Sequence, residues 1–304
     1  MEKVHFNFTL NEEQKAVRKK LIEELKVNPI VLKWLKDNKL DESYLNDHSA
    51  TIADWVDQLK GCDQCKGIEA CKQPRKGAYL DLTYNGVLLE QIVKCSYALK
   101  EENALAHKKQ YRICDLSESN LKINISDIVI DHESVDYKRV LNYILDFLME
   151  EKHEKGIYFY GRPGVGKTYL AAGISNYYAK KDKMVSFVNV ARLIGDIKNL
   201  FGDNDAVRSK INQLKKVEVL VLDDIGGESI TRWSRDEILL PVLDYRMENQ
   251  LLTIFTSNFS FDDLHHHFEL NELNVSDKIG ADRIMDRIKA LSCEKFINGS
   301  SRRI

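Results

Sequence analysis

Residues 156–168 read GIYFYGRPGVGKT, a short apolar run that leads directly into a glycine-rich loop. The loop from Gly161 to Thr168 matches the pattern G-x-x-x-x-G-K-[ST] at every fixed position. Glycines let successive backbone N–H groups curl around anionic oxygens, and a helix that begins near Lys167 adds its positive N-terminal end. The stretch therefore predicts a strand, a loop that binds the phosphates of ATP, and a helix.

Two side chains of this loop have distinct expected roles. Lys167 is placed to reach the β and γ phosphates, and the Thr168 hydroxyl to hold Mg²⁺. The residue after the loop is expected to join the nucleotide contacts. The complete set is Gly161, Pro163, Gly164, Val165, Gly166, Lys167, Thr168 and Tyr169.

Further strands are predicted by apolar runs at 184–190, 217–222 and 251–256, with stretches of helical character between them. A helix is expected from about 134 to 151. Strands that alternate with helices indicate an α/β domain with a mainly parallel, doubly wound sheet flanked by helices.

Two aspartates end the apolar run VLVL at 219–222. Asp223 is expected at the carboxyl edge of the sheet, where it would hold the metal through its water shell. Asp224 is expected to orient the attacking water. Its carboxylate has a shorter reach than that of glutamate, so slow turnover is expected. Alternatively, the pair begins a turn before Gly226 and Gly227.

Asn258 follows the apolar run at 251–256 and is expected to contact the γ-phosphate or the lytic water. Its alternative is an ordinary turn residue. Arg283 and Arg287 lie four residues apart and so share one helix face. Arginine suits the stabilisation of charge on a phosphoryl group, often from a neighbouring subunit. A surface ladder with Asp282 and Asp286 explains the same spacing.

Composition limits the classes of protein. The length of 304 residues suggests two domains, or one long one, and a content of 43% hydrophobic and 30% charged residues is ordinary for a globular protein. A formal net charge of −2 gives no global attraction to nucleic acid. There is neither an apolar run of bilayer length nor the layout of a secretory signal at the start, so we expect a cytoplasmic protein without membrane contact.

Cysteines concentrate in the first half of the chain. Cys62, Cys65 and Cys71 form a compact set whose first pair has the spacing of zinc knuckles. A structural zinc site needs a fourth ligand, for which Cys95 is preferred and Cys114 is second. A redox pair at Cys62 and Cys65, or buried unligated thiols, are the alternatives.

The first half is expected to be mainly helical, with helices at 12–26, 29–38 and 49–60. Short strands around a turn at Asn85-Gly86 follow. A polar stretch without strong periodicity suggests a linker. The expected organisation is a zinc-binding domain at 1–115, a linker at 116–127 and an ATPase domain at 128–304.

Several sequence motifs, by their order and spacing, resemble those of a known protein family. These are the phosphate loop, VLVLDDIGGESITRWSRDE at 219–237, Ser257-Asn258 and DRIMDR at 282–287. Together they resemble AAA+ ATPases of the bacterial helicase-loader clade. The resemblance covers about 120–304 well, and 1–115 mainly through the cysteines.

The resemblance implies roles that spacing alone does not give. Arg287 would be the arginine finger, Arg283 a second arginine of the same helix, and Arg302 a sensor-2 residue. Thr231 and Trp233 fall where loaders of this clade contact single-stranded DNA, and an indole can stack on any base. An ordinary core or surface tryptophan is the alternative for Trp233.

The resemblance also implies partners and a function. The zinc domain would bind the replicative hexameric helicase, and the ATPase domain would assemble with copies of itself and load the helicase onto single-stranded DNA. Rival interpretations are a DNA-binding transposition helper ATPase, a metabolic P-loop kinase, and an interaction protein that uses ATP only as a structural ligand.

Overall fold

The computed structural model describes residues 11–129, 133–200, 202–227, 231–269, 276–299 and 301–302 of the chain. The chain divides into two compact units, Met1–Asn103 (unit 1) and Ala104–Ile304 (unit 2). Within the described residues, no helix has both the length and the apolar character needed to cross a bilayer.

Unit 1 is a small helical bundle with one β-hairpin. It consists of α1 (Glu12–Lys26), α2 (Pro29–Asp37), a 3-10 turn η1 (Glu42–Tyr44), α3 (Leu45–Lys60), β1 (Ala78–Tyr84), β2 (Leu88–Lys94) and most of α4 (Ser96–Leu105).

Local sequence explains how these elements begin. Asn11 and Gln14 cap the start of α1 reciprocally, each side chain accepting the other's backbone N–H. Pro29 occupies the first turn of α2, where its missing N–H costs no hydrogen bond. The buried indole of Trp34 donates to the carbonyl of Leu82 at 2.8 Å, which fastens the hairpin to the helices. The expected helix at 12–26 and the hairpin turn at 85–87 are confirmed.

Unit 2 is built on a six-stranded sheet in the order β3-β5-β6-β7-β4-β8, in which all neighbouring strands are parallel. Its elements are η2 (Ala106–Gln110), β3 (Tyr111–Cys114), α5 (Glu118–Leu121), η3 (Ile125–Asp127), α6 (Val135–Met149), β4 (Gly156–Tyr160), α7 (Lys167–Lys180), β5 (Val185–Asn189), α8 (Val190–Asn199), α9 (Asn204–Lys216), β6 (Val219–Asp223), a π-helix η4 (Ser234–Leu239), α10 (Leu240–Glu248), β7 (Leu252–Ser257), α11 (Phe261–Glu269), α12 (Lys278–Leu291) and β8 (Ser292–Phe296).

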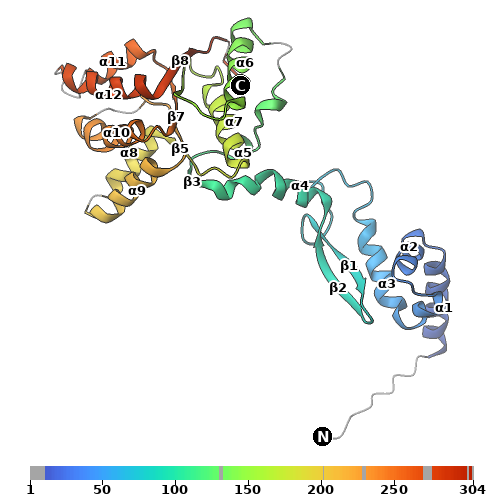
Figure 1. The fold of residues 1–304 in the computed structure, drawn as a ribbon. Coiled ribbons are helices and arrows are strands. Elements are labelled where there is room, and N and C mark those ends of the chain that lie inside the picture. Colours follow the sequence, from blue (N-terminus) through green and yellow to red (C-terminus); the bar gives the residue numbers. More distant parts are fainter. Residues whose placement is uncertain are drawn as a thin grey trace. The chain divides into compact units, whose positions relative to one another are not determined.

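Helices cover both faces of this sheet (Figure 1). Alternate residues of each strand point to opposite faces, so Ile157 and Phe159 pack with α6 and α7 whereas Tyr158 packs with α8 to α12. Every residue from Val219 to Asp223 is buried. The doubly wound α/β architecture expected from the sequence is therefore confirmed.

The boundary between the units lies earlier than the sequence suggested. Residues 104–115, assigned above to the zinc domain, belong to unit 2, where β3 pairs with β5 at one edge of the sheet. The stretch 116–127, interpreted as a linker, carries α5 and η3. Both pack on α7, and Ile125 lies against Gly173. Helix α4 was not foreseen.

Candidate nucleotide and metal sites

The glycine loop connects the carboxyl end of β4 to α7. Gly161 has φ +149°, and a Cβ there would collide with the backbone oxygen of Ile297. Gly166 has φ +103° and is the N-cap of α7. Both positions need glycine because of their backbone conformation, and Gly161 also because of this close approach. The loop therefore presents its N–H groups and the N-terminal end of α7 at one edge of the sheet.

Lys167 is buried and its ammonium group turns back over the loop. Nζ donates to the backbone oxygens of Gly161 (2.8 Å) and Arg162 (3.0 Å) and to Oδ1 of Asn258 (2.8 Å). The ammonium group thus lies within the loop, where phosphate oxygens could replace these acceptors.

Asn258, from the end of β7, joins this lysine to the second aspartate. Its Nδ2 donates to Oδ1 of Asp224 at 3.1 Å while its Oδ1 accepts from Lys167. The amide orientation is forced, because an ammonium group can only donate and a carboxylate can only accept. Asp224 itself has φ +58°, an uncommon left-handed conformation, and its N–H donates to the hydroxyl of Thr256.

Asp223 ends β6 and is 7% exposed. Its Oδ1 accepts hydrogen bonds from the hydroxyls of Thr168 (2.8 Å) and Thr256 (2.7 Å). Burial raises the pKa of the Asp223 carboxyl, and the two hydroxyls oppose this rise. A partly desolvated carboxylate beside a loop hydroxyl is a suitable donor set for hydrated Mg²⁺. The role of Thr256 was missed, because a threonine inside an apolar strand gives no local signal.

Arg302 reaches this loop from the end of the chain. Its backbone N–H donates to the oxygen of Gly164 at 2.9 Å, and its guanidinium lies 4.0 Å from the ring centre of Tyr137. The guanidinium also pairs with Glu133 at 2.6 Å. The structure thus brings the expected sensor-2 residue to the phosphate loop. Glu133 and Tyr137, at the start of α6, were not foreseen from the sequence.

The other expected arginines lie elsewhere. Arg287, on α12, pairs with Asp244 of α10 at 2.7 Å rather than with the loop of its own chain. Arg283 is exposed one turn earlier. A contribution to a neighbouring copy's site, as the resemblance implied, stays a prediction.

Thr231 and Trp233 lie just before the π-helix η4. The hydroxyl of Thr231 exchanges hydrogen bonds with Ser234, so it caps this turn. Trp233 is half-buried and packs against the apolar core between the sheet and α8 to α12. The structure therefore gives both residues local structural contacts, and their contact with DNA stays a prediction.

Unit 1 contains a cavity of about 420 Å³ whose lining includes Cys62, Cys65, Cys71 and Cys95. Cys114 instead ends β3 in unit 2, where burial raises the pKa of its thiol. The structure thus gathers the four cysteines preferred from the sequence. Among the described residues, however, the one set of three ligand atoms within 4.8 Å of one another is His265, His266 and Glu269 on α11. The thiols share a cavity at wider spacing.

Hydrogen bonds to sulfur fit these thiols for a metal. The Cys71 sulfur accepts from the N–H of Gly77 at 3.5 Å, and this bond lowers the pKa of the thiol. The Cys95 sulfur accepts from the N–H of Ala98 at 3.5 Å. Hydrogen bonds of this kind stabilise thiolate, the form that binds metal.

Comparisons with known proteins agree with this arrangement. The family model described as IstB-like ATP binding protein matches residues 83–304. The replicative helicase loader DnaI of Bacillus subtilis (strain 168) is 31% identical over 276 residues, which cover 89% of this chain and 88% of that protein.

Two solved structures resemble a large part of this chain. A crystal structure of DnaI is 33% identical and covers 65% of this chain and 99% of that chain, with a TM-score of 0.54. A crystal structure of the DnaC helicase loader is 26% identical and covers 60% of this chain and 100% of that chain, with a TM-score of 0.50.

Replacement of Asp223 tests two effects separately: its effect on the stability of the fold and its expected role in ATP hydrolysis. The raised pKa means that the native state holds this proton more tightly than the unfolded chain does, so the contribution of the carboxyl to the free energy of unfolding falls as pH rises through its pKa. We expect Asp223→Asn to unfold at a higher urea concentration at pH 7 without nucleotide. We also expect it to hydrolyse Mg-ATP at least about 100-fold more slowly.

Urea titration and phosphate release measure the two effects. Asp262→Asn, at an exposed position of α11, is the matched control and should change neither. Full hydrolysis by Asp223→Asn would contradict the assigned role.

Proposed function

The chain belongs to the family of IstB-like ATP-binding proteins, and on that premise we propose that it loads a replicative hexameric DNA helicase onto single-stranded DNA in an ATP-dependent manner. One observation carries the proposal. The match to the loader DnaI extends over 276 residues, too many to be confined to unit 2, so it includes much of unit 1. A transposition helper would not need unit 1 and its cysteines. A loader would work in the cytoplasm.

Unit 2 would supply the nucleotide switch. ATP and Mg²⁺ would bind between the glycine loop, Lys167, Thr168 and Asp223, and hydrolysis would use Asp224 and Asn258 to position water. Arg287 would act on the ATP of a neighbouring copy, for which it must leave Asp244. Nucleotide would thus bridge copies in an oligomer, and hydrolysis would release the bridge.

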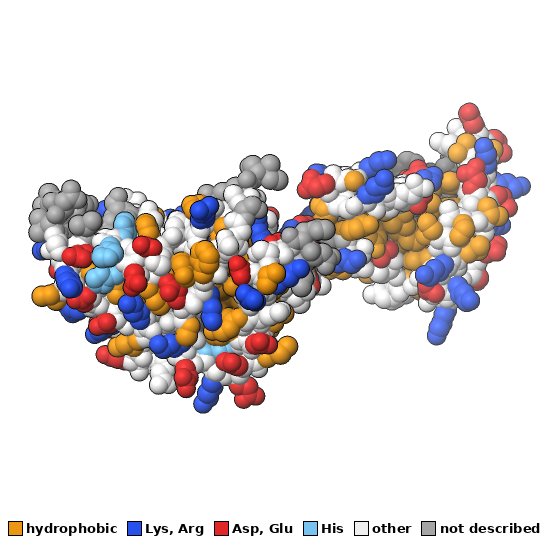
Figure 2. Space-filling view, turned by 90° about the horizontal axis from the view of Figure 1, so that it is seen from above, with side chains coloured by type: hydrophobic (Ala, Val, Ile, Leu, Met, Phe, Trp, Pro, Cys, Tyr) orange, Lys and Arg blue, Asp and Glu red, His pale blue; other side chains and the backbone are white. Residues whose placement is uncertain are grey.

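Unit 1 would supply the contact with the helicase. Its hairpin exposes large apolar side chains, with Val87 and Ile92 each 65% exposed and Leu89 46% exposed. Figure 2 shows hydrophobic side chains spread over the visible face of this unit, on the right of the view. Apolar surface of this extent is typical of a protein-binding face.

The test uses forked DNA coated with single-strand binding protein. We expect the full-length chain with Mg-ATP to raise unwinding by the replicative helicase at least about tenfold, and Arg287→Ala to lose most of this gain. Lys289→Ala, on the same helix, is the control. The proposed loading function would be contradicted if the chain left helicase activity unchanged and captured a transposase from lysate.

We further propose that Cys62, Cys65, Cys71 and Cys95 hold one structural Zn²⁺. Four thiolates would leave no open position for chemistry, so the metal would stabilise the loop-rich segment between α3 and β2. No three of these sulfur atoms lie within 4.8 Å of one another, so binding of the metal would draw them together.

Removal of two ligands tests the zinc site. We expect about one zinc per full-length chain by elemental analysis, and close to none in the double variant Cys62→Ser/Cys71→Ser. Chelation should lower the melting temperature of wild type but not that of the double variant. Cys293→Ser, at an exposed thiol in unit 2, should keep its zinc. A wild-type chain that is fully folded without metal and unaffected by chelator would refute the site.

A further inference from the structure

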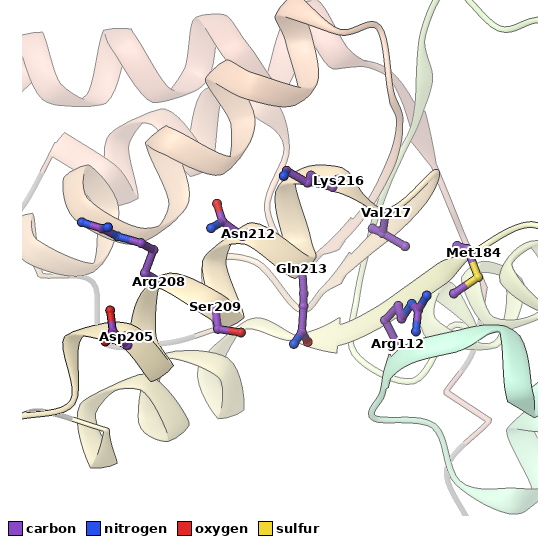
Figure 3. Close-up of a pocket in the computed structure, with 9 residues that line it drawn as sticks. All are labelled: Arg112, Met184, Asp205, Arg208, Ser209, Asn212, Gln213, Lys216 and Val217. Carbon is purple, nitrogen blue, oxygen red and sulfur yellow. The ribbon is translucent and has the colours of Figure 1, made fainter.

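A groove runs along one side of α9, at the amino ends of β5 and β6 (Figure 3). It encloses about 570 Å³. We call it the α9 groove; its lining includes Arg112, Met184, Arg208, Asn212, Lys216 and Val217. The glycine loop and Asp223 follow the carboxyl ends of strands, so the α9 groove lies at the opposite edge of the sheet from the nucleotide site.

The α9 groove carries an excess of positive charge. Arg112 comes from β3, and Arg208 and Lys216 come from α9; one acid, Asp205, shares the lining. Within the part of the chain that the structure describes, no ion pair or hydrogen bond is recorded for the side chains of these three cations.

Neighbouring cations behave differently. Lys210, also on α9, pairs with Asp196 at 2.8 Å, and Lys183 pairs with Glu218 at 2.8 Å. The three cations of the groove thus differ from these two neighbours, each of which is neutralised by a carboxylate. Such a concentration of charge attracts anions despite the net charge of −2.

The floor of the groove is held rigid from beneath. Arg246, fully buried in α10, donates to the backbone oxygens of Leu214 (3.0 Å) and Val217 (2.7 Å) at the end of α9. Burial lowers the pKa of Arg246 to about 9, which leaves its guanidinium charged at neutral pH. The helix end that carries Lys216 is thus positioned before any ligand binds, which reduces the entropy lost on binding.

We propose that the α9 groove binds the phosphate backbone of single-stranded nucleic acid. Arg208 and Lys216 lie eight residues apart, about 12 Å along the helix, so they can meet different phosphates of one strand. Amide side chains, including Asn212, and the apolar surface of Met184 offer contacts to sugars and bases. An acidic peptide would match the charge, but it would leave these amide and apolar contacts without a specific partner.

The inference rests on the proposed loading function, in which the chain meets a single strand, but it concerns a different surface from Thr231 and Trp233. Because the groove and the glycine loop lie at opposite edges of the sheet, a strand and ATP can be bound at the same time. The contact would be one of positioning, since phosphates carry no sequence information.

The test is the salt dependence of binding to a labelled oligothymidylate, measured by anisotropy with the full-length chain in Mg-ATP. Each lost phosphate contact reduces the slope of log K against log salt by about 0.7. We expect Arg208→Gln/Lys216→Gln to reduce the slope by about 1.4 and to weaken binding at least about tenfold at 0.1 M salt. Lys210→Gln, on the same helix, should match wild type. Unchanged ATP affinity in both variants shows that unit 2 remains folded.

Three results would overturn the inference. The double variant could bind with the slope of wild type. Polyglutamate could displace the oligonucleotide and bind wild type more tightly than the oligonucleotide does, while failing to bind the double variant. That result would assign the groove to an acidic protein. Wild type could bind no strand at all while still increasing helicase unwinding, which would remove the groove as a strand site and leave the loading function intact.

Discussion

The hydrogen bond from Thr168 to the buried carboxylate of Asp223 connects the phosphate loop to the centre of the sheet. Thr256 donates to the same oxygen from β7, the strand between β4 and β6. The first turn of α7 and the carboxyl ends of β6 and β7 are thereby held together around one desolvated carboxylate. Burial makes that charge costly, and a bound cation is the partner that would compensate for it. The position of Lys167 and Asn258 beside it follows from the same parallel arrangement.

Short stretches of sequence predicted those features of the fold whose conformation depends on neighbouring residues. The glycine loop, the strand before it and the helix at 12–26 could be located from such stretches. Edge strands β3 and β8 could not, since they are stabilised by pairing with strands distant in the sequence. The ion pair between Arg302 and Glu133 could not be predicted for the same reason. The two residues are distant in the sequence, and nothing in the residues around either one indicates that they meet. For Trp233 the sequence left open a stacking surface or an ordinary core or surface position; tertiary packing half-buries it against the core, and its contact with DNA stays a prediction.

The two edges of the sheet in unit 2 differ in chemistry. The carboxyl edge gathers acids, amides and one ammonium group around a glycine loop, which suits nucleotide and metal. The amino edge gathers unneutralised cations on a floor fixed by Arg246. Between them lies the sheet, in which every residue of the central strand β6 is buried, so each edge can hold a ligand without displacing the other's. Unit 1 adds a third kind of chemistry, four thiols around one cavity, that depends on neither edge.

The central claim is that this chain binds ATP with magnesium through the glycine loop, and equilibrium titration with a fluorescent ATP analogue tests it most directly. The account predicts saturable binding of one nucleotide per chain that requires Mg²⁺ for full affinity. Lys167→Ala should bind at least about 100-fold more weakly, because the ammonium group that meets the phosphates is gone. A wild-type chain without measurable affinity, or a variant that binds as tightly as wild type, would contradict it.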